Sequence, residues 1–193
     1  MRQRADAEEN RNALLDAARD VFAEHGVDAP LDLVRVRAHV GRATMYRHFP
    51  DRRDLHFAIV EASLARLEAC PPREEGGTVD LSDLFTLVAN EAANSPALHG
   101  VWDKVRLDPD AAPLVDRLTA VFEDPLRHAH KTGQATAWLT VEDMFLTMRM
   151  LGAASRGLSR ETRKAEADRA LSILIEGLGI ATPTPKEFQN ARH

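Results

Sequence analysis

The 193-residue sequence predicts an all-α protein. Apolar residues recur three and four positions apart in one segment after another, which is the spacing of residues on one face of a helix. No segment alternates apolar and polar residues between hairpin-turn signals, as a half-buried strand would. Glycine and proline separate the periodic segments, at places where they end helices.

The N-terminal part contains four predicted helices. They span about residues 8–25, 31–38, 42–49 and 52–69. Gly26 ends the first, because glycine readily takes the left-handed conformation that closes a helix, and Pro50 ends the third. The fourth is apolar around much of its circumference, so we expect it to pack on several sides and to join two domains.

Further helices are predicted after a loop at residues 70–77. They span about residues 81–94, 97–105, 114 to a stop at 131–133, 140–155 and 161–178. Pro125 should kink or split the helix that begins near residue 114, close to Phe122. Thr140 and Asp143 resemble a capping box at the start of the next helix.

Composition and charge limit the class of protein. The chain has 44% hydrophobic and 28% charged residues, as globular proteins do. No apolar run approaches the roughly 20 residues of a membrane span, the polar N-terminus does not resemble a signal peptide, and a single cysteine, Cys70, excludes an internal disulfide. We expect a cytoplasmic protein that does not contact a membrane.

The net charge of −5 is unevenly distributed along the chain. Residues 61–193 carry 15 basic and 20 acidic side chains, which accounts for the whole excess. Residues 31–57 carry six arginines against three aspartates. A locally basic segment on an acidic body is compatible with DNA binding at one end, and also with a plain globular protein.

Two short helices meet at the three-residue break His39-Val40-Gly41, with a longer helix on each side. This pattern predicts a helix-turn-helix, in which the second helix must be short and exposed to enter a major groove. The residues expected to face outward from it are Arg42, Thr44, Tyr46, Arg47 and His48. Arginine can read guanine, and hydroxyl groups and histidine can hydrogen-bond to phosphates.

The string Gly41 to Arg52, GRATMYRHFPDR, resembles the recognition-helix signature of TetR-family transcriptional regulators. The resemblance covers about residues 10–60, and the remainder matches only in its layout of helices. It implies that Arg42 and Thr44 contact bases or nearby phosphates and that Arg47 does either. It also implies that Tyr46 and His48 hold the DNA backbone, that Arg52 grips a phosphate, and that Arg2 and Arg4 form a basic arm along the duplex.

The sequence departs from the family pattern at two positions. The family usually has a small residue at Arg35, where the two short helices approach, and glycine at His39, where the backbone often needs a positive φ. Two interpretations stay open. Either Arg35 extends out of the contact and reaches toward phosphate, or both changes loosen the motif and weaken DNA recognition.

The resemblance implies a dimer through the last two long helices, and the small residues Gly152 to Ser155 would let another helix approach closely. The middle helices are expected to enclose a cavity for a small-molecule effector. The residues predicted to bind that molecule are Trp102, Phe122, Met144, Met148, His99 and His128, and Phe85, Trp138 and Arg106 are further candidates.

The predicted domains are a helix-turn-helix DNA-binding domain at 1–52, a helical ligand-binding and dimerisation domain at 53–181, and a mobile tail at 182–193. The predicted function is a ligand-responsive regulator: a repressor that binds a palindromic operator as a homodimer and is released by a small molecule. The alternative is a dimeric small-molecule or protein-binding module with weakened DNA recognition. No catalytic motif, cofactor motif or metal-ligand spacing is present in the sequence, so we expect a non-enzyme without cofactor or metal.

Overall fold

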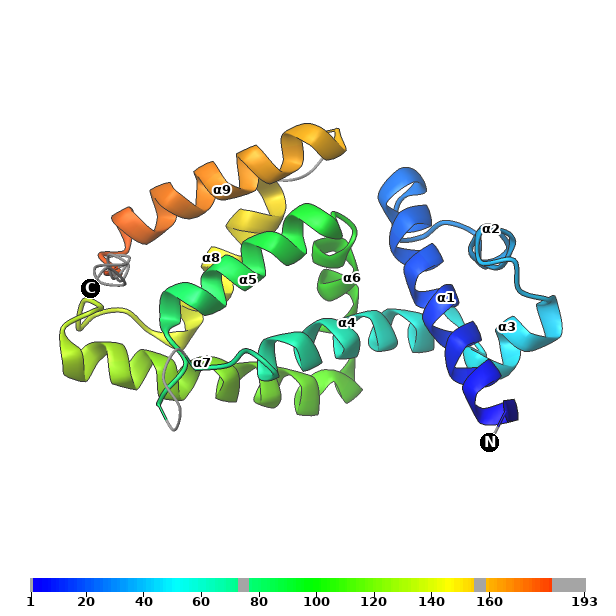
Figure 1. Ribbon diagram of the computed structural model, residues 1–193, viewed down its shortest axis with the longest axis horizontal. Coiled ribbons are helices and arrows are strands. Elements are labelled where there is room, and N and C mark those ends of the chain that lie inside the picture. Colours follow the sequence, from blue (N-terminus) through cyan, green and yellow to red (C-terminus); the bar gives the residue numbers. More distant parts are fainter. Residues whose placement is uncertain (1, 73–76, 155–158, 182–193) are drawn as a thin grey trace, which may run out of the picture.

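The computed structural model describes residues 2–72, 77–154 and 159–181. Over these residues the chain forms nine α-helices and one short 3-10 helix, with no strand, as predicted (Figure 1). The helices are α1 (Arg2–His25), α2 (Leu31–Arg37), α3 (Arg42–His48), α4 (Arg52–Glu68), α5 (Leu81–Asn94), α6 (Leu98–Val105), η1 (Pro109–Ala111), α7 (Ala112–Thr132), α8 (Val141–Ala154) and α9 (Arg160–Gly177).

Helices α1, α2 and α3 form one end of the molecule, together with the start of α4 (Figure 1). Their packing follows from the apolar stripe on each helix. Leu14 and Val21 of α1, Val34 of α2 and Met45 of α3 are all fully buried and belong to the same hydrophobic core. Burying a side chain of this size contributes about 1.5–3 kcal/mol, so the two short helices depend on this core for their position.

Helix α4 runs from this end into the rest of the molecule (Figure 1). It packs against α1 on one side and against α5, α6 and α7 elsewhere. Its buried residues extend from Leu55 to Leu67 and include two polar side chains, His56 and Ser63. The expectation that this helix packs on several sides is confirmed.

Helix α5 is the centre of the larger bundle, because it packs against α4, α6, α7, α8 and α9. Its Phe85 ring lies 6.0 Å from the ring of Phe122 on α7, measured between centroids. Both rings are fully buried. Among the described residues, no helix is both long and apolar enough to cross a bilayer.

Several local predictions can be compared with the helix ends. The capping box is present, since Asp143 accepts a hydrogen bond from Thr140 N (2.9 Å) and Asp143 N donates to Thr140 Oγ1 (3.3 Å). Of the two expected effects of Pro125, the split is wrong, because α7 continues through Pro125 as one helix, and the kink stays a prediction. Pro125 and Leu126 are buried, and this packing holds the helix together although proline removes a backbone donor. The predicted tail at 182–193 lies outside the described residues.

Candidate DNA-binding surface and ligand cavity

The turn between α2 and α3 ends α2 in a Schellman motif. Val40 N donates to Arg35 O (3.0 Å) and His39 N donates to Val36 O (3.2 Å), which are the two hydrogen bonds of that motif. The motif requires a left-handed backbone conformation at the residue after the helix cap, and that residue, His39, has φ 55°. The expected positive φ at His39 is therefore confirmed, and Val40 is buried beneath the turn.

Arg35 does not wedge α2 and α3 apart. Its side chain extends outward and makes a two-pronged ion pair with Asp32 in the same helix, at 2.7 and 2.8 Å. Arg37 is occupied in a similar way, because it pairs with Glu24 of α1. Arg35 and His39, the two departures from the family pattern, are thus accommodated without disturbing the packing of α2 and α3.

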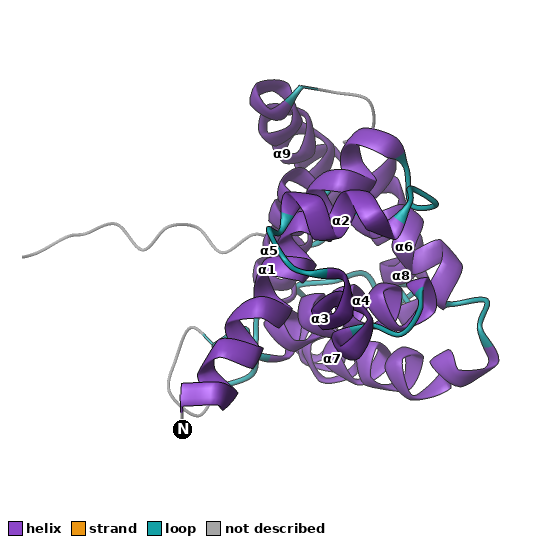
Figure 2. Cartoon of the chain, turned by 90° about the vertical axis from the view of Figure 1, so that its right-hand side faces the viewer, coloured by secondary structure: helices purple, strands orange, loops and turns teal. Residues whose placement is uncertain are grey.

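Helix α3 lies at the end of the molecule that faces the viewer in Figure 2, and it has an exposed polar side and a buried inner side. Met45 and the following Phe49 are buried and anchor it. Arg42 and Arg47 are exposed, and within the described residues neither guanidinium has a hydrogen bond or ion pair. The Arg42 guanidinium lies 5.8 Å from the centre of the Tyr46 ring, which is itself 40% exposed.

Two predicted DNA contacts are placed differently from the others. Arg52 Nη1 donates to the carbonyls of Val27 (3.1 Å) and Ala29 (2.7 Å), so this side chain braces α4 against the α1–α2 loop. His48 is half-buried, and its Nε2 is covered and has no hydrogen-bond partner among the described residues. Burial, followed by the charges of Arg47 and Arg11, lowers the pKa of His48. The phosphate contacts of both residues stay predictions, as does that of the half-buried Thr44.

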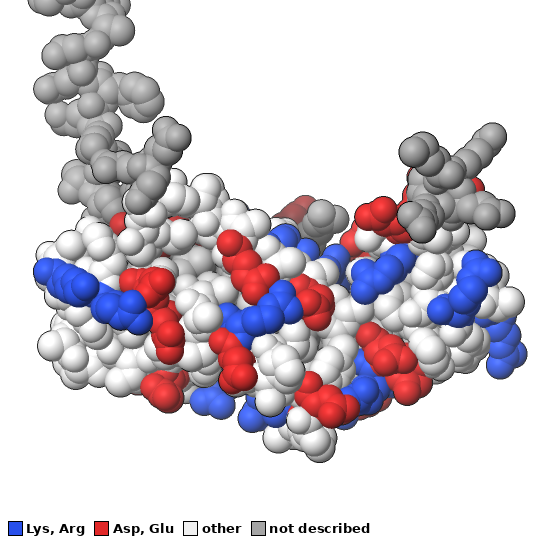
Figure 3. All heavy atoms as spheres, turned by 90° about the horizontal axis from the view of Figure 1, so that it is seen from below, with Lys and Arg blue, Asp and Glu red and all other residues white. Residues whose placement is uncertain are grey.

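Within residues 31–57, the two arginines without an ion pair or a carbonyl partner are therefore both on α3. Of the six arginines in residues 31–57, Arg35, Arg37 and Arg53 are held in ion pairs and Arg52 by carbonyls. In Figure 3 the outer end that carries α3 shows basic side chains without acidic neighbours, whereas the body shows both signs interspersed. The side chains of Arg2 and Arg4, the predicted arm, lie outside the described residues, and their backbone belongs to α1.

Ion pairs join this end to the larger bundle. Lys104 of α6 pairs with Asp28 of the α1–α2 loop at 3.0 Å. Arg53 of α4 donates to Asp108 at 2.7 and 2.9 Å and also contacts Asp110. The hydrogen bonds from Arg53 lower the pKa of Asp108 to about 2. Near these pairs, the buried His56 ring donates to the Val27 carbonyl (3.1 Å).

A cavity of about 90 Å³ lies between α4, α5, α6 and α8. Three of the predicted ligand-binding residues line it, namely Trp102, His99 and Met148. The others do not. Phe122 and Met144 are fully buried in the core away from the cavity, and His128 is exposed in a separate groove beside α7.

The further candidates also lie elsewhere. Phe85 packs on Phe122 in the core, Trp138 is exposed, and Arg106 is exposed and pairs with Asp103. Apolar periodicity shows which side of a helix faces inward, but it does not distinguish a cavity wall from a filled core.

The cavity also contains a charged group that the sequence analysis missed. Glu91 of α5 accepts hydrogen bonds from Ser63 Oγ (2.6 Å) and Arg66 Nε (2.8 Å), and Arg66 Nη2 contacts it as well. Burial opposes its ionisation, but the hydrogen bonds from Arg66 and Ser63 outweigh this effect and lower the pKa of Glu91. The available signal was a carboxylate three residues after Val88, on the apolar face of α5. In the described part of the chain, no group of three or more His, Cys, Asp or Glu side chains is arranged to hold a metal ion.

A short exposed helix with unpaired arginines, held by a second short helix across a tight turn, defines a helix-turn-helix DNA-binding protein. Residues 14–59 match the family model described as "Bacterial regulatory proteins, tetR family". An HTH-type transcriptional regulator from Staphylococcus aureus (strain USA300) is 34% identical over 62 residues, which are 32% of this chain and 34% of that protein. The matching stretch thus spans about a third of the length of this curated relative.

Solved structures resemble the whole fold. The TetR family protein CprB from S. coelicolor A3(2) has a TM-score of 0.62 at 20% identity, with 94% of each chain covered. The TetR transcription regulatory protein from Mycobacterium vanbaalenii has a TM-score of 0.57 at 26% identity, covering 91% of this chain and 98% of that one. Residues 14–59 of this chain are thus similar to the tetR family, and the fold of the described chain resembles that of solved TetR-family structures.

Proposed function

We propose that this chain is a ligand-responsive transcriptional repressor that binds a palindromic operator as a homodimer. The observation that carries the proposal is the outer face of α3, where Arg42 and Arg47 are exposed and unpaired among the described residues. Unpaired guanidinium groups are available for guanine edges and phosphates. The exposed ring of Tyr46 lies beside the Arg42 guanidinium, and its hydroxyl can hold the DNA backbone.

The proposed dimer forms through α8 and α9. Leu146 and Met150 of α8 and Ile173 of α9 are large apolar side chains that are exposed in the single chain. A second copy would cover them in a four-helix interface. Such a dimer presents two copies of α3, which suits two half-sites about one helical turn of DNA apart.

The proposed effector binds in the cavity lined by Trp102, His99 and Met148. Helix α6, which supplies Trp102 and His99, also pairs with the α1–α2 loop through Lys104 and Asp28. A molecule that displaces α6 therefore acts on the end that carries α3, and we propose that this releases the DNA. The protein acts in this scheme by binding in the cytoplasm and not by catalysis.

The test is selection of genomic DNA fragments by the purified protein at several stated salt concentrations. Enrichment of a short inverted repeat, with affinity falling steeply as salt rises, supports the proposal. Binding to all fragments alike supports the alternative, a dimeric small-molecule or protein-binding module with weakened DNA recognition.

The variant Tyr46→Ala should lose operator binding by about tenfold or more, since it removes a phosphate-binding hydroxyl and the ring beside Arg42. Its helicity and oligomeric state should match the wild type, because Tyr46 is exposed. The surface variant Arg127→Gln removes a positive charge far from α3, on α7, and serves as the control. Equal DNA affinity of Tyr46→Ala and Arg127→Gln would contradict the assignment of α3.

A further inference from the structure

One face of α8 forms a wall of the cavity. Phe145, Met148, Arg149 and Gly152 follow one another at helical spacing and all line it. The apolar residues Leu146 and Met150 point to a different side and are exposed. Arg149 lines the cavity and is also exposed to solvent, so it lies at the edge between the cavity and the surface.

Arg149 brings an uncompensated positive charge to this cavity. Its guanidinium has no hydrogen bond or ion pair to any described residue. Arg66, the other arginine close to this cavity, differs in that it is paired with Glu91. A guanidinium offers five donors in a planar fork that matches a carboxylate.

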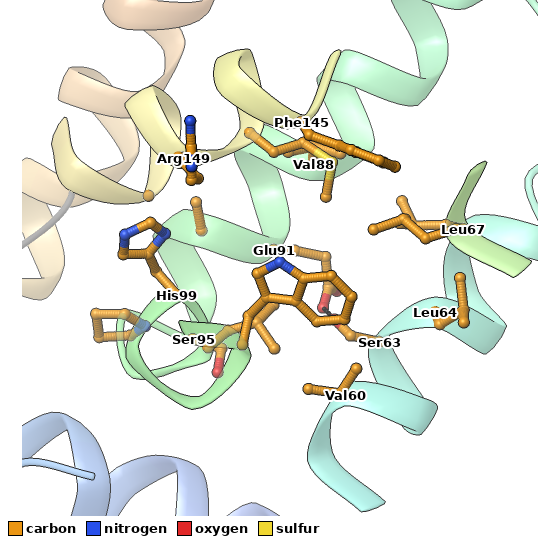
Figure 4. A pocket seen from close by; sticks show the side chains of 17 residues that line it. Val60, Ser63, Leu64, Leu67, Val88, Glu91, Ser95, His99, Phe145 and Arg149 are labelled. Carbon is orange, nitrogen blue, oxygen red and sulfur yellow. Dashed lines mark hydrogen bonds between the residues drawn. The ribbon is translucent and has the colours of Figure 1, made fainter. Parts of the chain in front are cut away.

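A second polar group in the cavity also has no partner. The Ser95 side chain is 5% exposed, and its hydroxyl makes no hydrogen bond to the described residues. A buried hydroxyl without a partner is unfavourable, so a ligand atom that bonds to it gains affinity. Figure 4 shows Ser95, His99 and Arg149 on the same side of the cavity.

The opposite side of the cavity is apolar. Leu64 and Leu67 of α4 lie across from Arg149 and His99 in Figure 4. The one carboxylate of the wall, Glu91, already accepts hydrogen bonds from Ser63 and Arg66 on both of its oxygens. Its negative charge is compensated within the protein, so the charge left for a ligand to meet is that of Arg149.

We propose that the cavity binds a small amphipathic carboxylate, with its carboxylate on Arg149 and its apolar body against Leu64 and Leu67. The Ser95 hydroxyl donates to the same head group, and the Trp102 ring covers the apolar body from α6. The inference rests on the proposed function only in naming this molecule as the effector. Binding itself can be measured without DNA.

The experiment compares three probes with the same apolar chain, namely octanoate, octanol and octylamine, at neutral pH. Binding is followed by fluorescence of Trp102 in a Trp138→Phe background, because Trp138 is exposed outside the cavity. Octanoate should bind about tenfold or more tightly than the other two probes, as a charge-assisted hydrogen bond provides.

Substitutions test whether Arg149 causes the preference for octanoate. Arg149→Gln should weaken octanoate about tenfold and leave octanol unchanged, while Arg149→Lys should retain part of the preference because it keeps the charge but loses the fork. Arg127→Gln, which removes the same charge from an exposed site on α7, should bind octanoate as the wild type does.

Three results would overturn the inference. Tightest binding of octylamine would mean that Glu91 and not Arg149 selects the head group. Equal binding of the three probes would mean that the cavity does not distinguish between their head groups. Failure of all three to change Trp102 fluorescence or to release heat on titration would mean that the cavity does not take this class of molecule.

These outcomes are separate from those of the proposed function. Octanoate that binds through Arg149 but does not release operator DNA supports the ligand class and contradicts ligand-controlled repression. Absence of operator enrichment contradicts the repressor and leaves the binding measurements intact.

Discussion

His39 holds a backbone conformation that glycine adopts at little cost, since its φ is 55° in the turn between α2 and α3. Histidine tolerates this region better than a β-branched residue, for which it is an outlier. We expect His39→Val to lower the free energy of unfolding by about 1–2 kcal/mol. His39→Gly should stay within about 0.5 kcal/mol of the wild type, because relief of strain offsets the greater entropy of its unfolded chain.

Urea unfolding of the two variants, followed by circular dichroism, measures the difference. If valine were as stable as glycine at this position, the turn would not require a left-handed residue.

His56 gives the stability a dependence on pH. Burial, followed by the charges of Arg52 and Lys104, lowers its pKa below 6.5 against the opposing effects of Val27 and Asp28. Between 6.5 and the lower folded pKa, the unfolded chain binds more protons than the folded chain. The contribution of His56 is therefore complete above pH 6.5 and is lost as the pH falls through the folded pKa.

We expect the free energy of unfolding to fall as the pH is lowered from about 6.5 through the folded pKa of His56, and to fall less steeply in His56→Gln. The glutamine amide can still donate to the Val27 carbonyl, and His48 is unchanged in both proteins. Parallel pH profiles of the two proteins, measured by urea unfolding, would show that His56 does not cause the dependence.

The positions of single side chains could be predicted where they depend on residues close by in the sequence. Tyr46 and Arg47 were assigned correctly to the outer face of α3, because a seven-residue helix between two turns leaves few orientations. Arg52 was expected at a phosphate, yet its donors meet the Val27 and Ala29 carbonyls, which only the folded loop brings near. Glu91 was missed because its partner Arg66 is on another helix.

At the scale of the helix, Gly152 sets the distance between α6 and α8. A Cβ at this position would lie 2.9 Å from His99 Cβ, which is closer than two such atoms approach. Gly152→Ala should therefore force α6 and α8 apart and lower the free energy of unfolding by about 1–3 kcal/mol. Thermal or urea unfolding of the variant tests this.

Gly177→Ala is the matched control, because a Cβ there meets nothing within 4 Å. Alanine in a helix is favoured over glycine by up to about 1 kcal/mol, so this variant should be as stable as the wild type or more so. Equal stability of both alanine variants would show that α6 has room to move away from α8.

Helix positions were largely predictable because apolar spacing and turn residues are local. The capping box at Thr140 and the stop at Gly133 follow from single side chains and one left-handed glycine. The split at Pro125 was predicted wrongly because the effect of a proline on a helix depends on the packing around it. Buried neighbours in α7 hold the helix although one backbone hydrogen bond is missing.

At the scale of the whole molecule, the exposed apolar residues of α8 and α9 predict the oligomeric state. The double variant Leu146→Glu, Ile173→Glu places charges in the proposed interface, where burial without a partner is costly. We expect it to be monomeric in size-exclusion chromatography with light scattering, and the wild type to be dimeric.

Leu107→Glu is the control, since Leu107 is 73% exposed after α6 and away from α8 and α9. It should remain dimeric. A dimeric double variant would place the interface elsewhere on the molecule.

The arrangement of the larger bundle could not be read from the sequence. The central place of α5 and its long contact with α9 join segments far apart in the chain, and periodicity carries no information on which apolar faces meet. For this reason only three of the six predicted ligand-binding residues line the cavity. On α3, whose residues are consecutive, Arg42, Tyr46 and Arg47 are exposed as expected, whereas Thr44 and His48 are half-buried.

Helix α4 has 17 residues, which gives it a length of about 25 Å. Its first residue is tied to the α1–α2 loop by Arg52, and its second half, from Val60 to Leu67, is cavity wall. Helix α4 is therefore a rigid connection between the cavity at its C-terminal end and the DNA-binding end at its N-terminus. A tilt of about 5° at the cavity would displace the other end by about 2 Å, enough to move a donor on α3 out of hydrogen-bond reach of a base.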